Sequence, residues 1–221
     1  MAGEIRMPTI LSIQKNEIAL EPDDFLETAR YLGYSKTKLP DEEIMGMIKS
    51  ACTELFGVVA PKAVYDCFDL AVEKGKDECE KSKISFADVV LYSESLGINL
   101  RNCRQVFLLA VTIGPQVDAL IRRTQVLDSV KASIMQAAGA MFAEKTIELI
   151  NAQIKDFAAS QNTKCKPRFS PGYGDVALEV QKDFFRLLPC SKIGLSLMDT
   201  LIMSPEKSIT AFIGLLSDFC K

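Results

Sequence analysis

The sequence contains no histidine. Without an imidazole, the chain cannot supply a Ser-His-Asp or Cys-His nucleophile system, an imidazole general base, or a histidine ligand for haem or a corrin cobalt. The seven cysteines form no C-x-x-C pair, so zinc sites with the usual ligand spacing are excluded too. Their odd number and wide spacing indicate reduced, mostly buried thiols.

The sequence also lacks an excess of positive charge and a long hydrophobic run. The net charge is −3 and the isoelectric point is about 5.2, which argues against a nucleic-acid partner. No apolar run reaches the roughly 18 residues of a membrane span. The stretch Met1–Pro8 has no apolar signal core. We therefore expect a cytoplasmic protein that works away from membranes.

Hydrophobic periodicity predicts both helices and strands. Apolar residues at helical spacing predict a helix from Asp41 to Gly57 and a longer one from Asp128 to Ala158. The stretch Ala63–Val72 alternates like a strand, and Val106–Val111 is a continuous apolar run typical of a buried central strand. Gly114-Pro115 then predicts the start of another helix.

The C-terminal third predicts a helix followed by a hairpin. The helix is expected from Asp175 to Leu187, where Pro189 follows. The apolar runs Leu201–Met203 and Ile209–Leu216 flank a five-residue polar turn and predict an antiparallel hairpin. Together these patterns predict one α+β domain over residues 1–221, with a mostly antiparallel twisted sheet and packed helices. Residues 1–100 form its N-terminal helical and strand part, and residues 101–221 form its core.

The middle of the long helix is small-sided, with the sequence Ala137-Ala138-Gly139-Ala140. Gly139 costs roughly 1 kcal/mol of helix propensity relative to alanine. Close packing of another element is the first explanation, and a ligand passing over the helix is the alternative.

The hexapeptide Arg168-Phe169-Ser170-Pro171-Gly172-Tyr173 combines features that suit a small zwitterionic ligand. An arginine fork can hold a carboxylate with two parallel hydrogen bonds. Proline fixes the bend, and glycine permits a positive φ or the close approach of a ligand. Tyr173 adds an aromatic face and a hydroxyl. Taken alone, the hexapeptide is first explained as an ordinary surface turn with a solvated arginine, and a ligand site is the alternative.

The spacing Arg168-x-x-x-Gly172-Tyr173 resembles the S-adenosylmethionine signature of the activation (reactivation) domain of cobalamin-dependent methionine synthase. The order that follows is also similar: an amphipathic helix over Val180–Leu187, an apolar strand, a proline-containing turn with Ser208, and the return strand Thr210–Gly214. Upstream, the Thr112–Gly114 turn and the helix with Ala137–Gly139 resemble stand-alone members of the family. The resemblance is close from Arg168 onward and loose elsewhere.

This resemblance implies a subunit that binds S-adenosylmethionine. Its job would be to support the reductive methylation of cob(II)alamin to methylcobalamin on a separate cobalamin-dependent methionine synthase, in methionine biosynthesis. The cobalamin would be carried by that partner chain, or by a related corrinoid protein. A flavodoxin-like or other reductase would supply the electron. No catalytic residue of this chain is expected, since alignment of the methyl group is the protein's contribution.

The resemblance also assigns roles to individual residues. Arg168 would bind the ligand carboxylate, and Tyr173 would lie beside the sulfonium. The backbone around Ser170, Pro171 and Gly172 would hold the adenine or the ribose. Backbone contacts on the opposite side would come from Ile213 and Gly214, where the larger enzyme carries an aromatic pair. Glu144 is a candidate partner for the ligand ammonium, although a solvated or helix-pairing role is the first explanation.

Two other functions remain open at this point. One is a module that docks on another corrinoid methyltransferase protein without binding a methyl donor itself. The other is a methyltransferase that acts on a small molecule or a different corrinoid protein.

Overall fold

The computed structural model describes residues 8–75 and 80–216. Most of the N-terminal stretch Met1–Pro8 and the cysteines Cys79 and Cys220 lie outside these residues. The helices and strands are β1 (Thr9–Ser12), the 3-10 helix η1 (Lys15–Ile18), α1 (Pro22–Tyr31), α2 (Glu42–Val58), β2 (Lys62–Glu73), β3 (Lys83–Phe86), β4 (Val89–Tyr92), α3 (Glu94–Asn99), β5 (Cys103–Thr112), α4 (Pro115–Leu127), α5 (Ser129–Ser160), the 3-10 helix η2 (Leu178–Val180), α6 (Gln181–Leu187), the 3-10 helix η3 (Cys190–Ile193), β6 (Ser196–Leu197), β7 (Met203–Ser204) and β8 (Ser208–Leu216).

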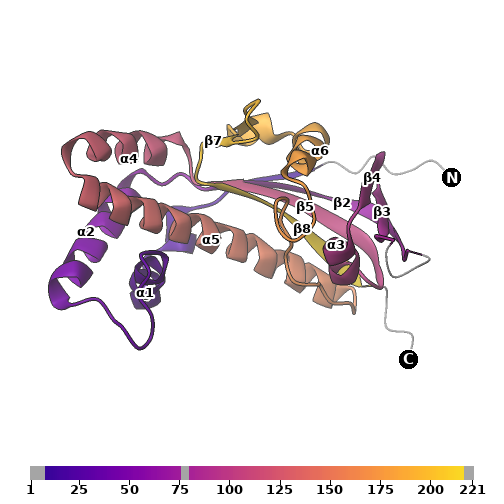
Figure 1. The fold of residues 1–221 in the computed structure, drawn as a ribbon, viewed down its shortest axis with the longest axis horizontal. Helices are drawn as coiled ribbons and strands as arrows, with labels where there is room; N and C mark the ends of the chain where they lie inside the picture. The colour runs from indigo at the N-terminus through magenta and orange to yellow at the C-terminus, as the bar shows by residue number, and fades with distance from the viewer. Residues whose placement is uncertain (1–7, 76–79, 217–221) are drawn as a thin grey trace.

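A six-stranded antiparallel sheet organises the molecule, with the order β4-β3-β2-β5-β8. The long strand β2 pairs with β1 through its first residues and with β3 through its last. The predicted single α+β domain with a mostly antiparallel sheet is confirmed (Figure 1). Residues 1–100 and 101–221 share this sheet, because β2 and β5 are neighbours over eight residue pairs.

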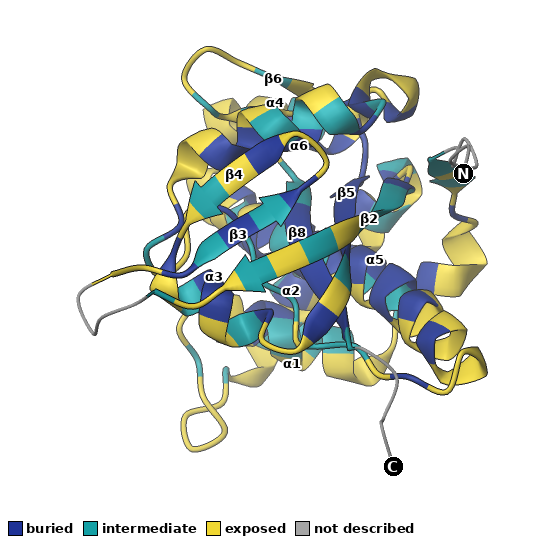
Figure 2. Ribbon diagram, turned by 90° about the vertical axis from the view of Figure 1, so that its right-hand side faces the viewer, coloured by how far each residue is buried: buried dark blue, intermediate teal, exposed yellow. Residues whose placement is uncertain are grey.

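The strand β5 is buried on both of its faces, as its continuous apolar run predicted. Phe107, Leu109 and Val111 belong to the core on one face of the sheet. The alternate residues Val106, Leu108 and Ala110 belong to the core on the other face. Because successive side chains of a strand point to opposite faces, a strand covered on both sides must be apolar throughout. Figure 2 shows this burial at the centre of the sheet and the exposed residues of β2 towards its rim.

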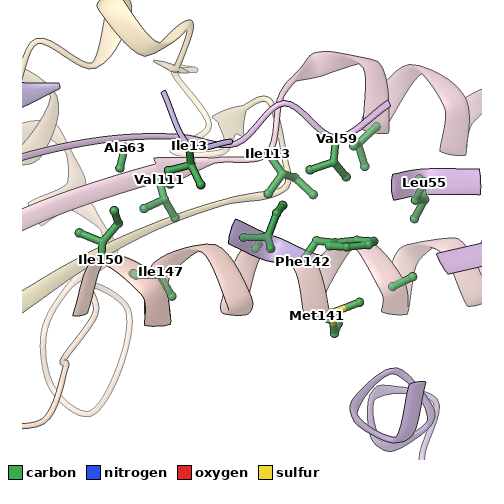
Figure 3. Close-up of a cluster of buried hydrophobic side chains, with 14 of the residues drawn as sticks. Ile13, Leu55, Val59, Ala63, Val111, Ile113, Met141, Phe142, Ile147 and Ile150 are labelled. Atoms are coloured by element: carbon green, nitrogen blue, oxygen red, sulfur yellow. The ribbon is translucent and has the colours of Figure 1, made fainter. Parts of the chain in front are cut away.

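The first core lies between the sheet and the long helix α5. Ile147 and Ile150 of α5 and Val111 of β5 contribute fully buried side chains to it (Figure 3). The helix α2 packs against α5 and begins as predicted at Asp41, whose carboxylate accepts a hydrogen bond from the amide of Ile44. Figure 1 shows α5 running along one face of the sheet and α6 lying on the other.

The second core lies under α3 and α6. Its centre is an aromatic cluster in which the ring of Phe212 on β8 lies 4.7 Å from that of Phe184 and 5.8 Å from that of Phe86, measured between centroids. All three side chains are buried. The cluster ties α6 and the β3–β4 hairpin to the same strand.

The helix predicted from Asp175 to Leu187 is shorter than expected. The α-helix begins at Gln181, after the 3-10 turn Leu178–Val180. Asp175 does not cap this helix because its carboxylate caps α3 instead, through the amides of Glu94 and Ser95. The prediction of its start was therefore wrong by six residues, whereas its end at Leu187 is confirmed.

The hairpin predicted between Leu201–Met203 and Ile209–Leu216 is wrong. Met203–Ser204 pairs with Ser196–Leu197 in a separate two-stranded sheet, and β8 pairs with β5. The reason is burial: β8 has fully buried residues on both faces, whereas Ile202 is half exposed. A strand that is apolar on both faces requires a position where both faces of the sheet are covered, and pairing with β5 provides it.

The small-sided stretch of α5 is explained by close packing. The side chain of Lys207 crosses the helix at Gly139, and a Cβ atom at this glycine would lie 3.0 Å from the Lys207 Cε atom. The Lys207 ammonium donates a hydrogen bond of 3.0 Å to the carbonyl of Gln136.

Among the described residues, no helix is both long enough and apolar enough to cross a membrane.

Candidate functional site

A cavity of about 860 Å³ opens at the edge of the sheet beside β8. The second half of β8 is covered by the segment Lys164–Phe169, since the amide of Lys166 donates to the carbonyl of Gly214 and Phe169 exchanges two hydrogen bonds with Phe212. Beyond Phe169 the segment leaves the edge, and Ser208, Ile209 and Thr210 line the cavity. Hydrogen-bonding directions alternate along a strand, so the Thr210 amide and carbonyl point to the same side as those of Phe212, towards the cavity.

The predicted bend forms the rim of this cavity. Gly172 has a φ of +87°, and a Cβ atom there would lie 3.2 Å from the Leu178 Cδ1 atom. The Tyr173 amide donates to the Ser170 carbonyl, and the Gly172 amide donates to the Val176 carbonyl. The turn therefore needs glycine at position 172. It leaves the side chain of Tyr173 69% exposed above the cavity.

Asp175 fastens the bend to α3. Its carboxylate accepts hydrogen bonds from the Ser93 hydroxyl at 2.5 Å, the Glu94 amide at 2.9 Å and the Ser95 amide at 3.1 Å. The ammonium of Lys81 lies 3.2 Å away. These donors, led by the Ser93 hydroxyl, hold the pKa of Asp175 far below its usual range, so the anchor is ionised at physiological pH.

Arg168 lies in the wall of the cavity between two glutamates of α5. Its Nη2 atom is 2.9 Å from Glu144 Oε2 and 2.7 Å from Glu148 Oε1, and its Nε atom is 3.2 Å from the same Glu148 oxygen. Burial opposes the charge on the guanidinium, but the two carboxylates outweigh it and raise the pKa of Arg168. Burial likewise opposes ionisation of Glu148, but hydrogen bonds from Asn151 and Arg168 lower its pKa. Arg168 and Glu148 are therefore charged at neutral pH, and the cluster holds two carboxylates for one guanidinium.

Two buried side-chain oxygens next to the cavity have no hydrogen-bond donor among the described residues. They are Asn151 Oδ1 on α5 and Gln181 Oε1 at the start of α6. Both residues line the cavity and are more than nine-tenths buried. An unpaired buried oxygen costs roughly 1–3 kcal/mol, so each of these two lining residues has an acceptor that the described part of the chain leaves unsatisfied.

The far end of the cavity carries two lysines, Lys155 and Lys166, and the thiol of Cys165. Burial raises the pKa of Cys165, so the thiol is protonated at neutral pH and is not an activated nucleophile. Among the described residues, no group of three or more potential ligands could hold a metal ion. The cavity thus offers charges and hydrogen-bonding groups for binding.

Most of the predicted site residues meet at this cavity. Arg168, Ser170, Pro171, Tyr173 and Glu144 line it together. Glu144 both lines the cavity and pairs with Arg168, so its expected role towards a ligand ammonium stays a prediction. Gly172 lies within the bend between two lining residues.

Ile213 and Gly214 are placed elsewhere, which corrects their predicted position. Ile213 is fully buried in the core beneath α5. A Cβ atom at Gly214 would lie 2.6 Å from Cys103 Sγ and 2.8 Å from Leu100 Cδ2, so this glycine lets the turn before β5 pack closely. This part of β8 is already covered by Lys164–Phe169, and the strand meets the cavity only at Ser208–Thr210.

Sequence reasoning missed Glu148, Asn151, Gln181 and Met203, all of which line the cavity. Glu148 and Asn151 follow Glu144 at helical spacing, so they lie on the same face of α5. That spacing was readable in the sequence. No local pattern marks Gln181 or Met203, which reach the cavity through the packing of α6 and β7.

Comparisons with known proteins find the fold but no sequence relative. No family model matches the chain, and no curated protein does. Among solved structures, the chain is similar to the crystal structure of the MetH reactivation domain bound to AdoHcy (S-adenosylhomocysteine), with a TM-score of 0.67 and 14% sequence identity. The alignment covers 94% of this chain and 78% of that one. The chain therefore has the fold of the MetH reactivation domain, as the resemblance of its C-terminal third indicated.

Proposed function

We propose that this protein binds S-adenosylmethionine in the cavity beside β8 and serves as a reactivation subunit for a separate cobalamin-dependent methionine synthase. The observation that carries the proposal is the meeting of Arg168, Glu144 and Tyr173 at one cavity in a fold shared with an AdoHcy-bound reactivation domain. The bend and Arg168 come from one segment, and Glu144 comes from a helix 24 residues earlier in the chain. An ordinary surface turn would not need these residues, which come from separate segments, to line one cavity.

The charged cluster at one wall of the cavity, away from Lys155 and Lys166, can pair with the charges of the ligand. S-adenosylmethionine carries a carboxylate, an ammonium and a sulfonium, and therefore one positive charge in excess. The cluster of Arg168, Glu144 and Glu148 carries one negative charge in excess. An incoming carboxylate can pair with the guanidinium while the ammonium pairs with a glutamate, so both charges of the amino-acid end find an opposite partner in the cluster. The exposed ring of Tyr173 lies at the rim, where an aromatic face stabilises a sulfonium.

The chain would contribute alignment to the reaction. Cobalamin held by the partner chain would be the methyl acceptor once a flavodoxin-like or other reductase had supplied an electron. The methyl group would pass to it from the sulfonium, and S-adenosylhomocysteine would be the product released from this chain. Residues of this chain hold the carboxylate, the ammonium and the nucleoside, so the methyl group faces outward from an open cavity in the cytoplasm.

The first experiment measures ligand binding to the purified protein. We expect calorimetry to detect S-adenosylmethionine and S-adenosylhomocysteine. Arg168→Ala should weaken both by at least about tenfold, because a hydrogen bond to a charged group contributes roughly 1.5–3 kcal/mol. Arg186→Ala is the matched control, since Arg186 also pairs with two carboxylates, Asp88 and Asp183, but does not line the cavity.

A second experiment tests the role. The protein, a methionine synthase lacking its own reactivation domain, a reductase and S-adenosylmethionine are combined, and recovery of the methylated cofactor is followed by its absorbance. We expect recovery with the wild-type chain and with Arg186→Ala, and none with Arg168→Ala. Ligand binding without recovery would leave a binding protein and remove the proposed role.

One observation favours the alternative of a docking module without a methyl donor. The guanidinium of Arg168 already has two carboxylate partners, so a ligand carboxylate must compete with Glu144 and Glu148. In that case the cluster would only hold α5 to the bend. The alternative predicts association with a corrinoid protein that Arg168→Ala and Tyr173→Phe leave unchanged, with no ligand binding by calorimetry.

A further inference from the structure

Gln181 is a buried polar residue whose side-chain oxygen has no hydrogen-bond partner among the described residues. It is 7% exposed, it opens α6, and it lines the cavity. No donor among the described residues reaches its Oε1 atom. A leucine or methionine would fill a buried site of this size without leaving a polar atom unpaired, so the amide calls for a partner that the chain itself does not supply.

The position of Gln181 separates it from the charged cluster. Glu144, Glu148 and Arg168 form the wall on the α5 side, which packs on one face of the sheet. Gln181 belongs to α6, whose neighbours Val180 and Phe184 are buried in the core on the opposite face. Figure 1 shows the two helices on opposite faces of the sheet. The cavity therefore reaches around the sheet edge, with the charged groups at one wall and an uncharged amide at the other.

This division orients a ligand that is charged at one end only. The amino-acid end of an adenosyl ligand belongs with Arg168 and the glutamates, which leaves the nucleoside for the wall of Gln181 and Met203. A glutamine amide presents an acceptor and a donor side by side, the pattern that pairs with the N6 amino group and N7 of adenine. The terminal torsion of glutamine is soft, so its oxygen can turn into the cavity at little cost.

Resting on the proposed function, we infer that Gln181 is the residue that reads the base, by accepting a hydrogen bond from the 6-amino group of the adenine. The site then selects adenosyl over inosyl ligands. Hypoxanthine has an oxygen in place of the amino group, and the buried Gln181 oxygen would stay unpaired beside it.

The test compares two ligands on three proteins by calorimetry. Wild-type protein should bind S-adenosylhomocysteine roughly tenfold more tightly than S-inosylhomocysteine, because a bidentate amide–adenine pair discriminates by about this factor or more. Gln181→Met keeps the size of the side chain and should lose this preference by binding the adenosyl ligand more weakly. Gln153→Met is the matched control, because Gln153 is exposed on α5 and lines a different cavity.

Each outcome decides a different point. Equal binding of the two ligands by the wild-type protein overturns the inference, even if Gln181→Met does not fold. A preference that survives in a folded Gln181→Met protein also overturns it and leaves the proposed function intact. Failure of the wild-type protein to bind either ligand overturns the proposed function and this inference together.

Discussion

Asp175 joins the bend of the cavity to α3 through a single carboxylate. Three donors and the ammonium of Lys81 converge on it. The residue does not itself line the cavity, yet it fixes the segment that carries Tyr173. Its contribution is therefore to stability and to the position of the rim.

We predict that Asp175→Asn lowers the free energy of unfolding at pH 7 by about 1–2 kcal/mol, because the charge-assisted hydrogen bonds to α3 are weakened. The folded-state pKa lies far below the unfolded value of about 3.9. Stabilisation by the ionised group is thus present above pH 4 and is lost as the pH falls below it. Urea unfolding of both proteins between pH 7 and pH 3 measures the difference.

The difference between wild type and Asp175→Asn should shrink over the acid part of this range. Asp199→Asn is the control, because Asp199 is exposed and should change stability by less than about 0.5 kcal/mol at any pH. A difference that stays constant down to pH 3 would contradict the assignment of the effect to the Asp175 charge.

At this scale, sequence reasoning located residues that line the cavity better than it described their partners. The order Arg168 to Tyr173 predicted a bend with Gly172 at its turn, because proline and glycine restrict the backbone locally. The partners of Arg168 come from α5 and the partners of Asp175 from α3. Contacts over such distances in the chain depend on how the elements pack, which no local pattern encodes.

Among the elements, the sequence of α5 is constrained at Gly139 by the side chain of Lys207, which crosses the helix there. The Cε, Cδ and Cγ atoms of Lys207 would all lie within 3.2 Å of a Cβ atom at Gly139. We predict that Gly139→Leu lowers the free energy of unfolding by about 1–3 kcal/mol, since the larger side chain must displace this lysine. Chemical denaturation measures the change.

The same substitution in α2 should act in the opposite direction. Gly46 is an exposed helical glycine with no atom within 4 Å of an added Cβ. Gly46→Leu should raise the free energy of unfolding by up to about 1 kcal/mol, through helix propensity alone. If both variants were more stable than the wild type, displacement of the Lys207 side chain would not lower the stability. The explanation of the small-sided stretch by close packing would then be wrong.

Elements with strong local signals were predicted well. The helices α2 and α5 and the strands β2 and β5 lie within a few residues of their expected bounds, because their periodicity and capping residues are local. The start of α6 and the partner of β8 were not. Asp175 is a good capping residue that caps a different helix, and β8 pairs with a strand about a hundred residues away in sequence.

The whole molecule depends on the pairing of β2 with β5, which joins the two parts of the chain. We predict that a fragment of residues 101–221 shows no cooperative unfolding transition by circular dichroism. Without β2 and α2, the apolar residues of β5 and α5 are left uncovered. Co-expression with residues 1–100 should restore the transition. A fragment that unfolds cooperatively alone would show that its core is independent.

The sheet also bears on how copies of this protein meet. Strand edges that expose long rows of unpaired amides and carbonyls invite other chains to add to them. On one border here, β4 has only four residues. On the other border, the segment Lys164–Phe169 covers half of β8, and the rest of the strand lines the cavity at Ser208–Thr210. A second copy therefore meets few unpaired backbone amides and carbonyls at these two borders of the sheet. We expect concentrated solutions of the protein to resist fibre formation through this sheet.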